Sequence, residues 1–421
     1  MHEPWVGGGA GGDRRAGGAG GALRAAVGAR VVIVVDATPL QTGHRVRGIG
    51  TYTGGLLDAL TRLPRPMPLS LLRQPPQPTD APALADVLAR PSITTVPLLK
   101  PPWRKDRLQW LVSQPAIALA LRHAGARLYH ATDSNGLVLV PRVTTVAMVY
   151  DLIPLHNPAV LFPPRWLDQR IGYARYLRLL RRVDHLIAIS EATKRDVVER
   201  LRIPPERITV TPLAVDARRF YPRPAAEIDR VLARYRLRRP YFLHVGSYVG
   251  PSDQNKNTAN ILRAFDLFSR DPNATHSLYL AGKWSPSAMQ EIYAAYPRLA
   301  DSGRLRALGY VPDDDLSALY GGADLFVYPS LLEGFGLPIL EAMRCACPVL
   351  TSTVSSLPEV AGDAALLVDP RGTEAMAEAM ARLAGDTELR ADLVRRGQTR
   401  AALFSWERTA RLTLEVYRAL S

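Results

Sequence analysis

The stretch Ala323–Met343 constrains the fold of this chain more than any other part of its sequence. It opens with an apolar run, Ala323–Pro329, which is followed by a turn with two glycines and then by a helix-forming segment. Continuous apolar runs of this kind are typical of strands that are buried on both faces of a parallel sheet. The order strand, glycine turn, helix therefore predicts an α/β unit with a parallel sheet.

The start of the predicted helix has the features of an anion site. Pro338 suits the first helical turn, where its missing N–H costs no hydrogen bond, and the free amides and dipole there attract anions. Glu333 precedes the helix and Glu341 lies one turn into it. Carboxylates at this place could bind the hydroxyls of a ligand while the amides of the helix start hold its phosphate. A ligand with both groups is a sugar nucleotide. A simpler interpretation stays open, in which Gly334 and Gly336 permit a tight turn and Glu341 complements the dipole.

The composition indicates a globular protein of more than one domain. The 421 residues correspond to about two domains, with 22% charged and 47% hydrophobic residues. No apolar run approaches the roughly 20 residues that span a bilayer. The formal net charge of +14 leaves anionic lipid, nucleic acid and phosphorylated substrates open as partners.

Cysteine usage and the first residues bear on the compartment. Cys345 and Cys347 are the two cysteines of the chain, which excludes a disulfide framework, and a C-x-C pair is a poor zinc site. We interpret them as small packed residues, expect no metal, and expect a reducing cytoplasm. Residues 1–29 are rich in Gly and Ala and lack the apolar core of a signal peptide, which indicates a disordered tail or an upstream start codon.

The first half of the chain alternates strands and helices. Val31–Asp36 is predicted as a strand, Arg45–Gly50 as a glycine loop and Thr51–Leu60 as a helix, an order that is compatible with phosphate binding. A flexible turn is the alternative for the loop. Thr144–Asp151 is a strand with Asp151 at its carboxyl end, where such sheets bind ligands. Asp151 is therefore a candidate for acceptor contact or charge control, or else a cap for the next turn.

Trp103–Leu111 combines two tryptophans with three cations, Arg104, Lys105 and Arg107. Aromatic rings and interleaved cations before an apolar helix face are typical of a helix that lies in a membrane interface. An ordinary surface helix with snorkelling arginines is the alternative.

The second half begins after a break in composition at Phe220–Pro224. Tyr241–Ser247 is predicted as a strand that ends in glycine, and a helix is predicted over Thr258–Phe268. Lys256 precedes this helix, where it is either a ligand of a diphosphate or a solvated surface lysine. Strand–helix alternation thus occurs twice, on either side of a proline-rich linker, which predicts two α/β domains.

The segment Glu333–Met343 resembles the Glu-x7-Glu motif of the family 4 retaining glycosyltransferases, in the form Glu-Gly-Phe-Gly-Leu-Pro-x-Leu-Glu-Ala-Met, and it matches every fixed position. The resemblance extends from about Val31 to Leu420. It implies the GT-B fold, an α/β architecture of two facing Rossmann-like domains with a cleft between them. We expect an acceptor-side domain over 30–219, a linker over 220–239, a nucleotide-sugar-binding domain over 240–404, and a helix over 405–421 that crosses back to the first domain.

The resemblance also implies roles for individual residues. Glu333 and Asp151 are expected to be catalytic, with Glu333 holding sugar hydroxyls and Glu341 holding the ribose. The donor diphosphate is expected to contact Lys256, Gly48, Gly50 and Arg47. The donor sugar is expected to contact Glu333, Gly334, Phe335, Gly336 and Leu337. The nucleotide is expected to contact Glu341, Tyr310 and Val311, and no metal is implied.

Two positions depart from the family pattern. Tyr150 stands before Asp151 where the family usually has histidine, so a histidine role cannot be carried over. Asn255 stands before Lys256 where arginine is usual. One cation of the diphosphate site is therefore missing or is supplied from elsewhere, for which Arg47 is the candidate.

The implied activity is transfer of a sugar with retention, from a nucleotide diphosphate sugar as co-substrate and without another cofactor, to a hydroxyl of a glycan or lipid-linked acceptor. Similarity to bacterial mannosyltransferases of cell-surface polysaccharide or glycolipid assembly favours GDP-mannose over a UDP-sugar. We expect a cytoplasmic protein that associates reversibly with the anionic inner face of the membrane and binds no nucleic acid. The alternatives are a GT-B sugar-phosphate enzyme, either an epimerase or a phosphorylase, and a non-catalytic basic module that binds membrane or nucleic acid.

Overall fold

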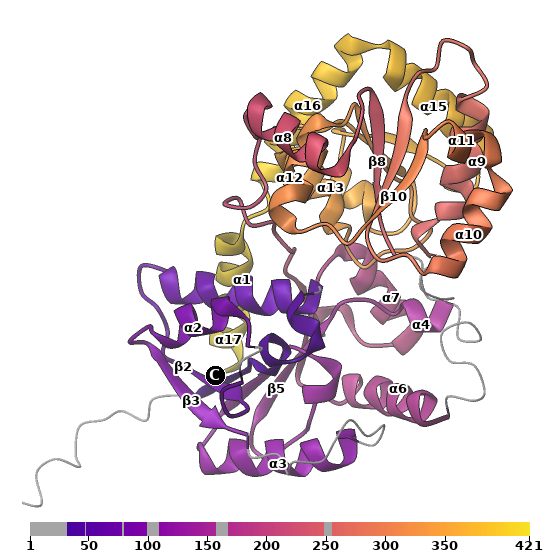
Figure 1. The fold of residues 1–421 in the computed structure, drawn as a ribbon. Helices are drawn as coiled ribbons and strands as arrows, with labels where there is room; N and C mark the ends of the chain where they lie inside the picture. The colour runs from indigo at the N-terminus through magenta and orange to yellow at the C-terminus, as the bar shows by residue number, and fades with distance from the viewer. Residues whose placement is uncertain (1–31, 47, 78–79, 99–108, 157–166, 248–254) are drawn as a thin grey trace, which may run out of the picture. The chain divides into compact units, whose positions relative to one another are not determined.

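The computed structural model of the protein describes residues 32–46, 48–77, 80–98, 109–156, 167–247 and 255–421 (Figure 1). Two parallel sheets organise these residues, one of seven strands and one of six. This arrangement confirms the predicted α/β fold with two sheets.

The first sheet has the strand order β3-β2-β1-β4-β5-β6-β7. Its strands are β1 (Ile33–Asp36), β2 (Leu69–Arg73), β3 (Ile93–Pro97), β4 (Leu128–Ala131), β5 (Thr144–Val149), β6 (His185–Ala188) and β7 (Ile208–Val210). Strand β1 pairs with β2 on one side and with β4 on the other, so the strand order reverses between β1 and β4. Open α/β sheets bind ligands at such a switch point, outside the carboxyl ends of the strands.

The second sheet repeats this plan with the order β10-β9-β8-β11-β12-β13. Its strands are β8 (Tyr241–Val245), β9 (Ser277–Ala281), β10 (Leu305–Gly309), β11 (Leu325–Tyr328), β12 (Val349–Ser352) and β13 (Leu366–Val368). Strand β8 pairs with β9 and with β11, which places the switch point between β8 and β11. The apolar run before the glycine turn is thus a central strand that flanks the switch point.

Helices connect the strands (Figure 1). Those up to β7 are α1 (Gly48–Arg62), α2 (Pro82–Leu88), α3 (Gln109–His123), α4 (Ile153–His156), α6 (Leu167–Leu180) and α7 (Glu191–Leu201), with short 3-10 turns at Thr38–Gln41, Gly43–Val46, Ser134–Gly136 and Pro205–Arg207. Those after β7 are α8 (Ala225–Tyr235), α9 (Thr258–Phe268), α10 (Pro286–Ala295), α11 (Pro297–Asp301), α12 (Asp313–Gly322), α13 (Leu337–Arg344), α14 (Leu357–Ala361), α15 (Thr373–Gly385), α16 (Thr387–Ala402) and α17 (Trp406–Leu420).

Helix α1 starts three residues earlier than the sequence predicts, so Gly48 and Gly50 are helical and do not form a loop before the helix. Gly50 is buried, and a Cβ at this position would lie 2.5 Å from the carbonyl oxygen of His44. The turn before α1 therefore packs directly on its backbone, and this close approach requires glycine whether or not a ligand binds nearby.

The segment 220–239, which the sequence predicts as a linker, carries helix α8. Ile228, Val231 and Leu232 form its buried face. Ile228 lies against the glycines at the end of α12, since a Cβ on Gly321 would be 3.3 Å from its side chain. The proline that precedes α8 indicates a break in the chain, but it also suits a helix start.

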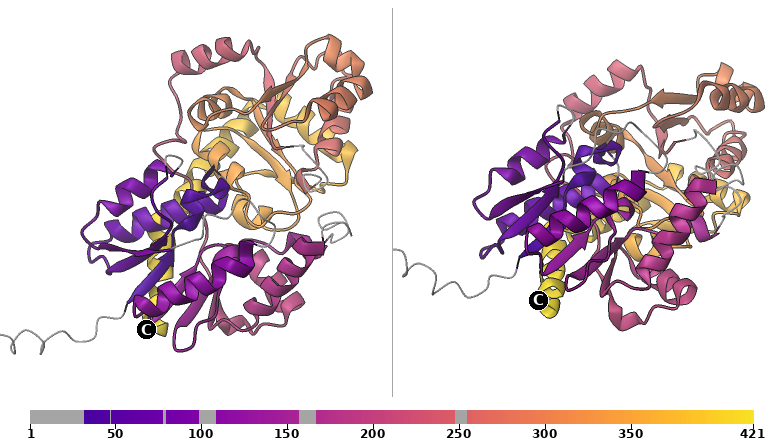
Figure 2. Two further views of the ribbon diagram at one scale, coloured as in Figure 1. Left: turned by 60° about the horizontal axis from the view of Figure 1, so that its bottom comes forward. Right: turned by 90° about the horizontal axis from the view of Figure 1, so that it is seen from below.

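The last helix, α17, packs on elements of the first sheet. A Cβ on Gly55 of α1 would lie 2.3 Å from the ring of Trp406, and Tyr417 Oη lies 2.7 Å from Nδ1 of the buried His130 on β4. The yellow C-terminal helix lies among the indigo and purple elements in both views of Figure 2. The chain thus passes the second sheet and then returns to the first.

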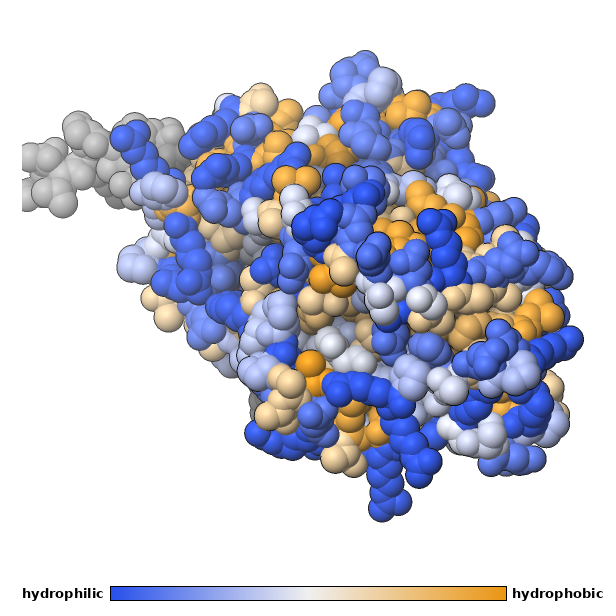
Figure 3. Space-filling view, turned by 90° about the horizontal axis from the view of Figure 1, so that it is seen from above, coloured by the Kyte–Doolittle hydropathy of each residue, from blue (hydrophilic) through white to orange (hydrophobic). Residues whose placement is uncertain are grey.

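Among the described residues, no helix is long and apolar enough to cross a bilayer. The face drawn in Figure 3 is predominantly hydrophilic, with apolar side chains in small groups. Residues 99–108, which include most of the stretch Trp103–Leu111, lie outside the described residues.

Cys345 and Cys347 are buried free thiols in the core, which fits their interpretation as packed residues.

Candidate functional site

Three polar side chains meet at the carboxyl end of the second sheet, beside its switch point. Lys256 Nζ lies 2.7 Å from Glu333 Oε1 and 2.6 Å from Tyr328 Oη, and Tyr328 Oη donates to the same Glu333 oxygen at 2.9 Å. The side chains of Lys256 and Glu333 are 28% and 13% exposed. Lys256 is therefore part of a half-buried group and is not a solvated surface lysine.

The protonation states of this group follow from its contacts. Burial acts to lower the pKa of Lys256, but the Glu333 carboxylate and Tyr328 outweigh it and raise that pKa above its ordinary value. Burial and the Glu333 carboxylate both raise the pKa of Tyr328. At neutral pH the lysine is charged and the phenol keeps its proton, so Glu333 accepts two hydrogen bonds from these neighbours.

The loop Glu333–Leu337, which we call the motif loop, is held by two serines that follow β12. Ser355 Oγ accepts from the Glu333 amide at 3.0 Å and donates to the Glu333 carbonyl at 2.6 Å. Ser356 Oγ donates to the Phe335 carbonyl at 2.8 Å. Among the described residues, the amides of Gly334, Phe335 and Gly336 have no hydrogen-bond acceptor. These three N–H groups are thus not used in hydrogen bonds among the described residues.

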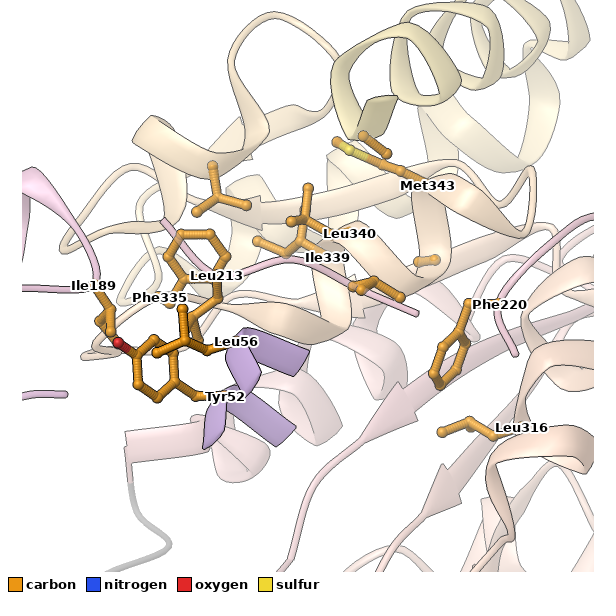
Figure 4. Close-up of a cluster of buried hydrophobic side chains, with 14 of the residues drawn as sticks. Tyr52, Leu56, Ile189, Leu213, Phe220, Leu316, Phe335, Ile339, Leu340 and Met343 are labelled. Atoms are coloured by element: carbon orange, nitrogen blue, oxygen red, sulfur yellow. The ribbon is translucent and has the colours of Figure 1, made fainter. Parts of the chain in front are cut away.

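Phe335 and Gly336 fix the motif loop by packing. Phe335 is 3% exposed and lies in an apolar cluster with residues of α1, α13 and the segment before α8, shown in Figure 4. Gly336 has a φ of 107°, which favours glycine, and a Cβ there would lie 2.6 Å from Leu357. The turn therefore needs glycine at this position for its backbone and for its packing.

The start of α9 forms a second anion-compatible feature beside Lys256. Asn257 precedes the helix, but its side-chain amide donates to the carbonyls of Pro329 and Pro370 at 2.9 and 2.6 Å and does not cap α9. Thr258 Oγ1 is buried and has no hydrogen-bond partner among the described residues. The first amides of α9 are thus left without a side-chain cap, next to a charged lysine.

Gly334 meets the end of β5 from the first sheet. A Cβ on Gly334 would lie 2.1 Å from the Tyr150 carbonyl oxygen and 3.2 Å from Asp151 Cβ. Asp151 Oδ1 accepts from the Ile153 amide at 3.0 Å, so it caps the turn before α4. Burial raises the pKa of Asp151, and the nearby Glu333 carboxylate adds to this effect while the Ile153 amide opposes it. The structure therefore brings both predicted catalytic carboxylates to one region.

Glu341 lies one turn into α13, where its Oε2 accepts from Tyr320 Oη at 3.1 Å. Burial raises the pKa of Glu341 to about 7. Of the other two residues assigned to the nucleotide, Tyr310 is 64% exposed and Val311 is buried. The exposed phenol ring of Tyr310 is available to a ligand, whereas Val311 belongs to the core.

The remaining predicted contacts of the diphosphate lie on the first sheet. Gly48 is exposed, with open space around the position of a Cβ. Arg47 lies outside the described residues. Among the described residues, no hydrogen bond joins Gly48 or Gly50 to Lys256, and their contact with the diphosphate stays a prediction.

The two departures from the family pattern have structural roles. Tyr150 Oη donates to the Thr132 carbonyl at 2.8 Å, and burial raises its pKa well above the ordinary value. It therefore remains neutral and tied to the end of β4, unlike a histidine that titrates. The Asn255 carbonyl accepts from the Leu331 amide at 2.8 Å and joins the segment before α9 to the segment before the motif loop.

Sequence reasoning missed the hydroxyls that support the carboxylates. Tyr328 and Tyr320 contact Glu333 and Glu341, and Ser355 holds the backbone of Glu333. A tyrosine at the carboxyl end of a predicted central strand is the signal that points to Tyr328. Among the described residues, no group of three or more His, Cys, Asp or Glu side chains is placed to hold a metal ion.

Comparison with known protein families agrees with this geometry. Residues 46–219 match the model of glycosyltransferase family 4, and residues 239–386 match that of the glycosyl transferases group 1. The chain belongs to the family 4 (group 1) glycosyltransferases. The resemblance of the motif loop to that family is therefore confirmed.

Relatives within the family include mannosyltransferases. The chain is 37% identical over 238 residues to O-antigen chain mannosyltransferase B of Escherichia coli. The aligned region covers 56% of this chain and 60% of that protein. It is 32% identical over 283 residues to the serotype-specific mannosyltransferase WbdA of Escherichia coli. That aligned region covers 66% of this chain and 33% of the relative. The chain thus spans less than two thirds of either relative.

A solved structure matches the fold of nearly the whole chain. Anabaena HepE in complex with UDP and glucose superimposes with a TM-score of 0.68 at 18% identity, covering 92% of this chain and 99% of that chain. At this identity the match shows a common fold, which is the GT-B fold of glycosyltransferases. The predicted fold class is confirmed.

Proposed function

We propose that this protein is a retaining glycosyltransferase that moves a sugar from a nucleotide diphosphate sugar to a hydroxyl of a glycan or lipid-linked acceptor. The observation that carries the proposal is the contact of Lys256, Tyr328 and Glu333 beside the free amides of the motif loop. A cation for the diphosphate and a carboxylate for sugar hydroxyls are thus 2.7 Å apart. Membership of the family supports the same reaction class.

In the proposed mechanism, negative charge grows on the leaving diphosphate while the anomeric carbon becomes cation-like. Lys256 and the amides at the start of α9 stabilise the diphosphate, an effect of roughly 3 kcal/mol for a well-placed donor. Lys256 and Tyr328 hold one carboxylate oxygen of Glu333. The other carboxylate oxygen accepts from the sugar hydroxyls and orients the donor. Asp151 faces the acceptor side and balances the positive charge, and Glu341 holds the ribose hydroxyls.

The donor is proposed to be GDP-mannose, because both relatives compared above are mannosyltransferases. A UDP-sugar is the alternative, since the HepE complex contains UDP. Cell-surface polysaccharide or glycolipid assembly, in the cytoplasm at the inner face of the membrane, is the proposed setting. No cofactor besides the donor is invoked.

A thermal-shift screen of nucleotide sugars tests the proposal. A ligand at 100 times its dissociation constant stabilises the folded protein by about 2.7 kcal/mol, so GDP-mannose is expected to raise the Tm by several degrees. If sugar is released only by inorganic phosphate, the protein is a phosphorylase. If no nucleotide shifts the Tm and binding to anionic surfaces falls steeply with salt, it is a non-catalytic basic module.

The raised pKa of Glu341 predicts a pH dependence of stability. Its pKa is about 7 in the folded protein against an ordinary value of 4.5, so the folded state holds the proton more tightly than the unfolded state. The stabilisation is full below pH 4.5 and is lost as the pH rises through about 7. Relative to the parent, Glu341→Gln should therefore gain Tm between pH 5 and pH 8, measured by calorimetry at about five pH values.

Glu407→Gln is the matched control, because Glu407 forms an exposed ion pair with Arg411. Its Tm should follow that of the parent across the same pH range. A Tm difference between Glu341→Gln and the parent that is constant with pH would show that Glu341 does not change its protonation on folding.

Membrane association is proposed from the stretch Trp103–Leu111, most of which lies outside the described residues. Each cation near an anionic surface contributes about 1 kcal/mol, and the attraction decays within a Debye length. Neutralising Arg104, Lys105 and Arg107 together should therefore reduce co-sedimentation with anionic vesicles at low salt more than removing residues 1–30 does. If the triple variant sediments like the parent, the stretch is an ordinary surface helix.

A further inference from the structure

The start of α7 reaches across from the first sheet to the motif loop. Ser190 is the N-cap of α7, and its Oγ accepts from the Thr193 amide at 3.0 Å. The same oxygen lies 2.7 Å from the Gly334 carbonyl oxygen and donates to it. Thr193 Oγ1 is a second donor to that carbonyl at 3.2 Å, and both side chains are buried. A carbonyl oxygen has two lone pairs and accommodates both hydroxyls.

These hydroxyls fix the direction of a backbone amide in the motif loop. In a planar trans peptide the C=O and the following N–H point in opposite directions. Because the Gly334 carbonyl points at Ser190 and Thr193, the Phe335 N–H points away from α7. This amide has no acceptor among the described residues, and it belongs to the loop assigned to the donor sugar.

A carboxylate from α14 completes a ring of contacts. Glu359 accepts from the first two amides of α7, with Oε1 2.9 Å from Glu191 N and Oε2 3.2 Å from Ala192 N. Helix α14 begins after Ser356, which holds the Phe335 carbonyl. The other end of α14 is held by Arg400, whose side chain donates to the carbonyls of Glu359 and Val360. The motif loop, α14 and α7 therefore each contact the other two.

We propose that Ser190 and Thr193, supported by Glu359, are positioning residues of the transfer reaction. They set the peptide between Gly334 and Phe335 so that its N–H meets the donor sugar. The inference rests on the function proposed above. It adds that two residues at the start of α7, which follows a strand of the first sheet, orient the Phe335 N–H that contacts the donor sugar. Docking of α7 on the motif loop is then a condition for turnover, while nucleotide binding by Lys256 does not depend on it.

The test compares two helix caps of the same chemistry. Ser285 is the N-cap of α10 and accepts from the Ala288 amide, as Ser190 does from Thr193 in α7. Replacing either serine by alanine should cost about 1 kcal/mol of stability through the lost cap. Only Ser190→Ala should lower kcat, by about tenfold, less than the roughly hundredfold cost of losing a direct donor. The affinity for the nucleoside diphosphate should stay within about twofold of the parent.

Thr193 gives a second pair of variants in case Ser190→Ala folds poorly. Thr193→Val removes the hydroxyl at nearly constant shape and should lower kcat, whereas Thr193→Ser keeps the hydroxyl and should retain it. Equal kcat values for Ser190→Ala and Ser285→Ala, or for Thr193→Val and Thr193→Ser, would overturn the proposal.

Hydrogen exchange separates a failure of this inference from a failure of the proposed function, because it needs no substrate. The Glu333 amide, which donates to Ser355 Oγ, should exchange faster in Ser190→Ala than in Ser285→Ala. If the parent transfers no sugar but this difference is seen, the proposed function fails and the contact of α7 with the loop stands as a structural one. If exchange in the loop is the same in both variants, α7 does not hold the loop and the inference fails.

Discussion

Replacing Glu333 by glutamine should abolish most turnover while leaving the affinity for the nucleoside diphosphate nearly unchanged. Its carboxylate is held by Lys256 and Tyr328, so its position is fixed while its charge is available to the sugar. Glutamine keeps the shape but loses the charge that orients the hydroxyls and stabilises a cation-like anomeric carbon. Loss of one such preorganised group lowers kcat by about 10²–10³-fold. Steady-state rates at saturating donor measure the effect.

Glu341→Gln is the matched control, because it removes a carboxylate from the same motif. Its proposed partner is the ribose, so it should weaken nucleotide binding and change kcat less. Equal effects of both replacements on the affinity for free nucleotide would contradict this division of roles.

Replacing Lys256 by alanine should weaken binding of the nucleoside diphosphate by about 30-fold, since a hydrogen bond from a charged group contributes about 2 kcal/mol. Glu333 keeps Tyr328 as a donor and its side chain is 13% exposed, so the variant is expected to stay folded. Calorimetric titration measures the affinity, and circular dichroism checks the fold.

Arg270→Ala is the control for Lys256→Ala. Arg270 forms an exposed ion pair with Asp266 on α9 and should not affect nucleotide binding. An unchanged affinity of Lys256→Ala would assign the diphosphate to another cation, for which Arg47 is the first candidate.

Local patterns in the sequence predict several elements at their observed positions. Helix α9 spans Thr258–Phe268 as predicted, because its apolar residues recur at helical spacing and bury one face. The start of α13 is also where Pro338 and the preceding glycine place it. Both elements depend on neighbours along the chain, which is the information that a sequence pattern contains.

Other features depend on contacts between distant residues. Gly50 has the appearance of a loop glycine, but it lies in α1, and the close approach of the His44 carbonyl is what requires glycine there. The phenol of Tyr328 reaches Lys256 only because β8 and β11 are neighbours in the sheet. Glu359 contacts α7 across 168 positions of sequence. Strand order and packing determine such contacts between distant residues, so a local sequence pattern does not predict them.

The two carboxylates that are predicted to be catalytic illustrate the same division. The sequence places Glu333 and Asp151 after strands of two different sheets, and both are predicted as catalytic from the family resemblance. Their proximity comes from Gly334, which packs directly on the backbone of Tyr150. Burial raises the pKa of Asp151, and the Glu333 carboxylate adds to this effect through a proximity that the sequence alone does not reveal.

The most direct test of the central claim is a paired titration of the nucleoside diphosphate and its nucleotide sugar into the parent and Glu333→Gln. If one group holds both the diphosphate and the sugar of a single donor, the parent should bind the nucleotide sugar more tightly than the diphosphate. Glu333→Gln should lose that difference and keep its affinity for the diphosphate. Equal weakening of both ligands in Glu333→Gln, or no change in either, would contradict the assignment of Glu333 to the sugar.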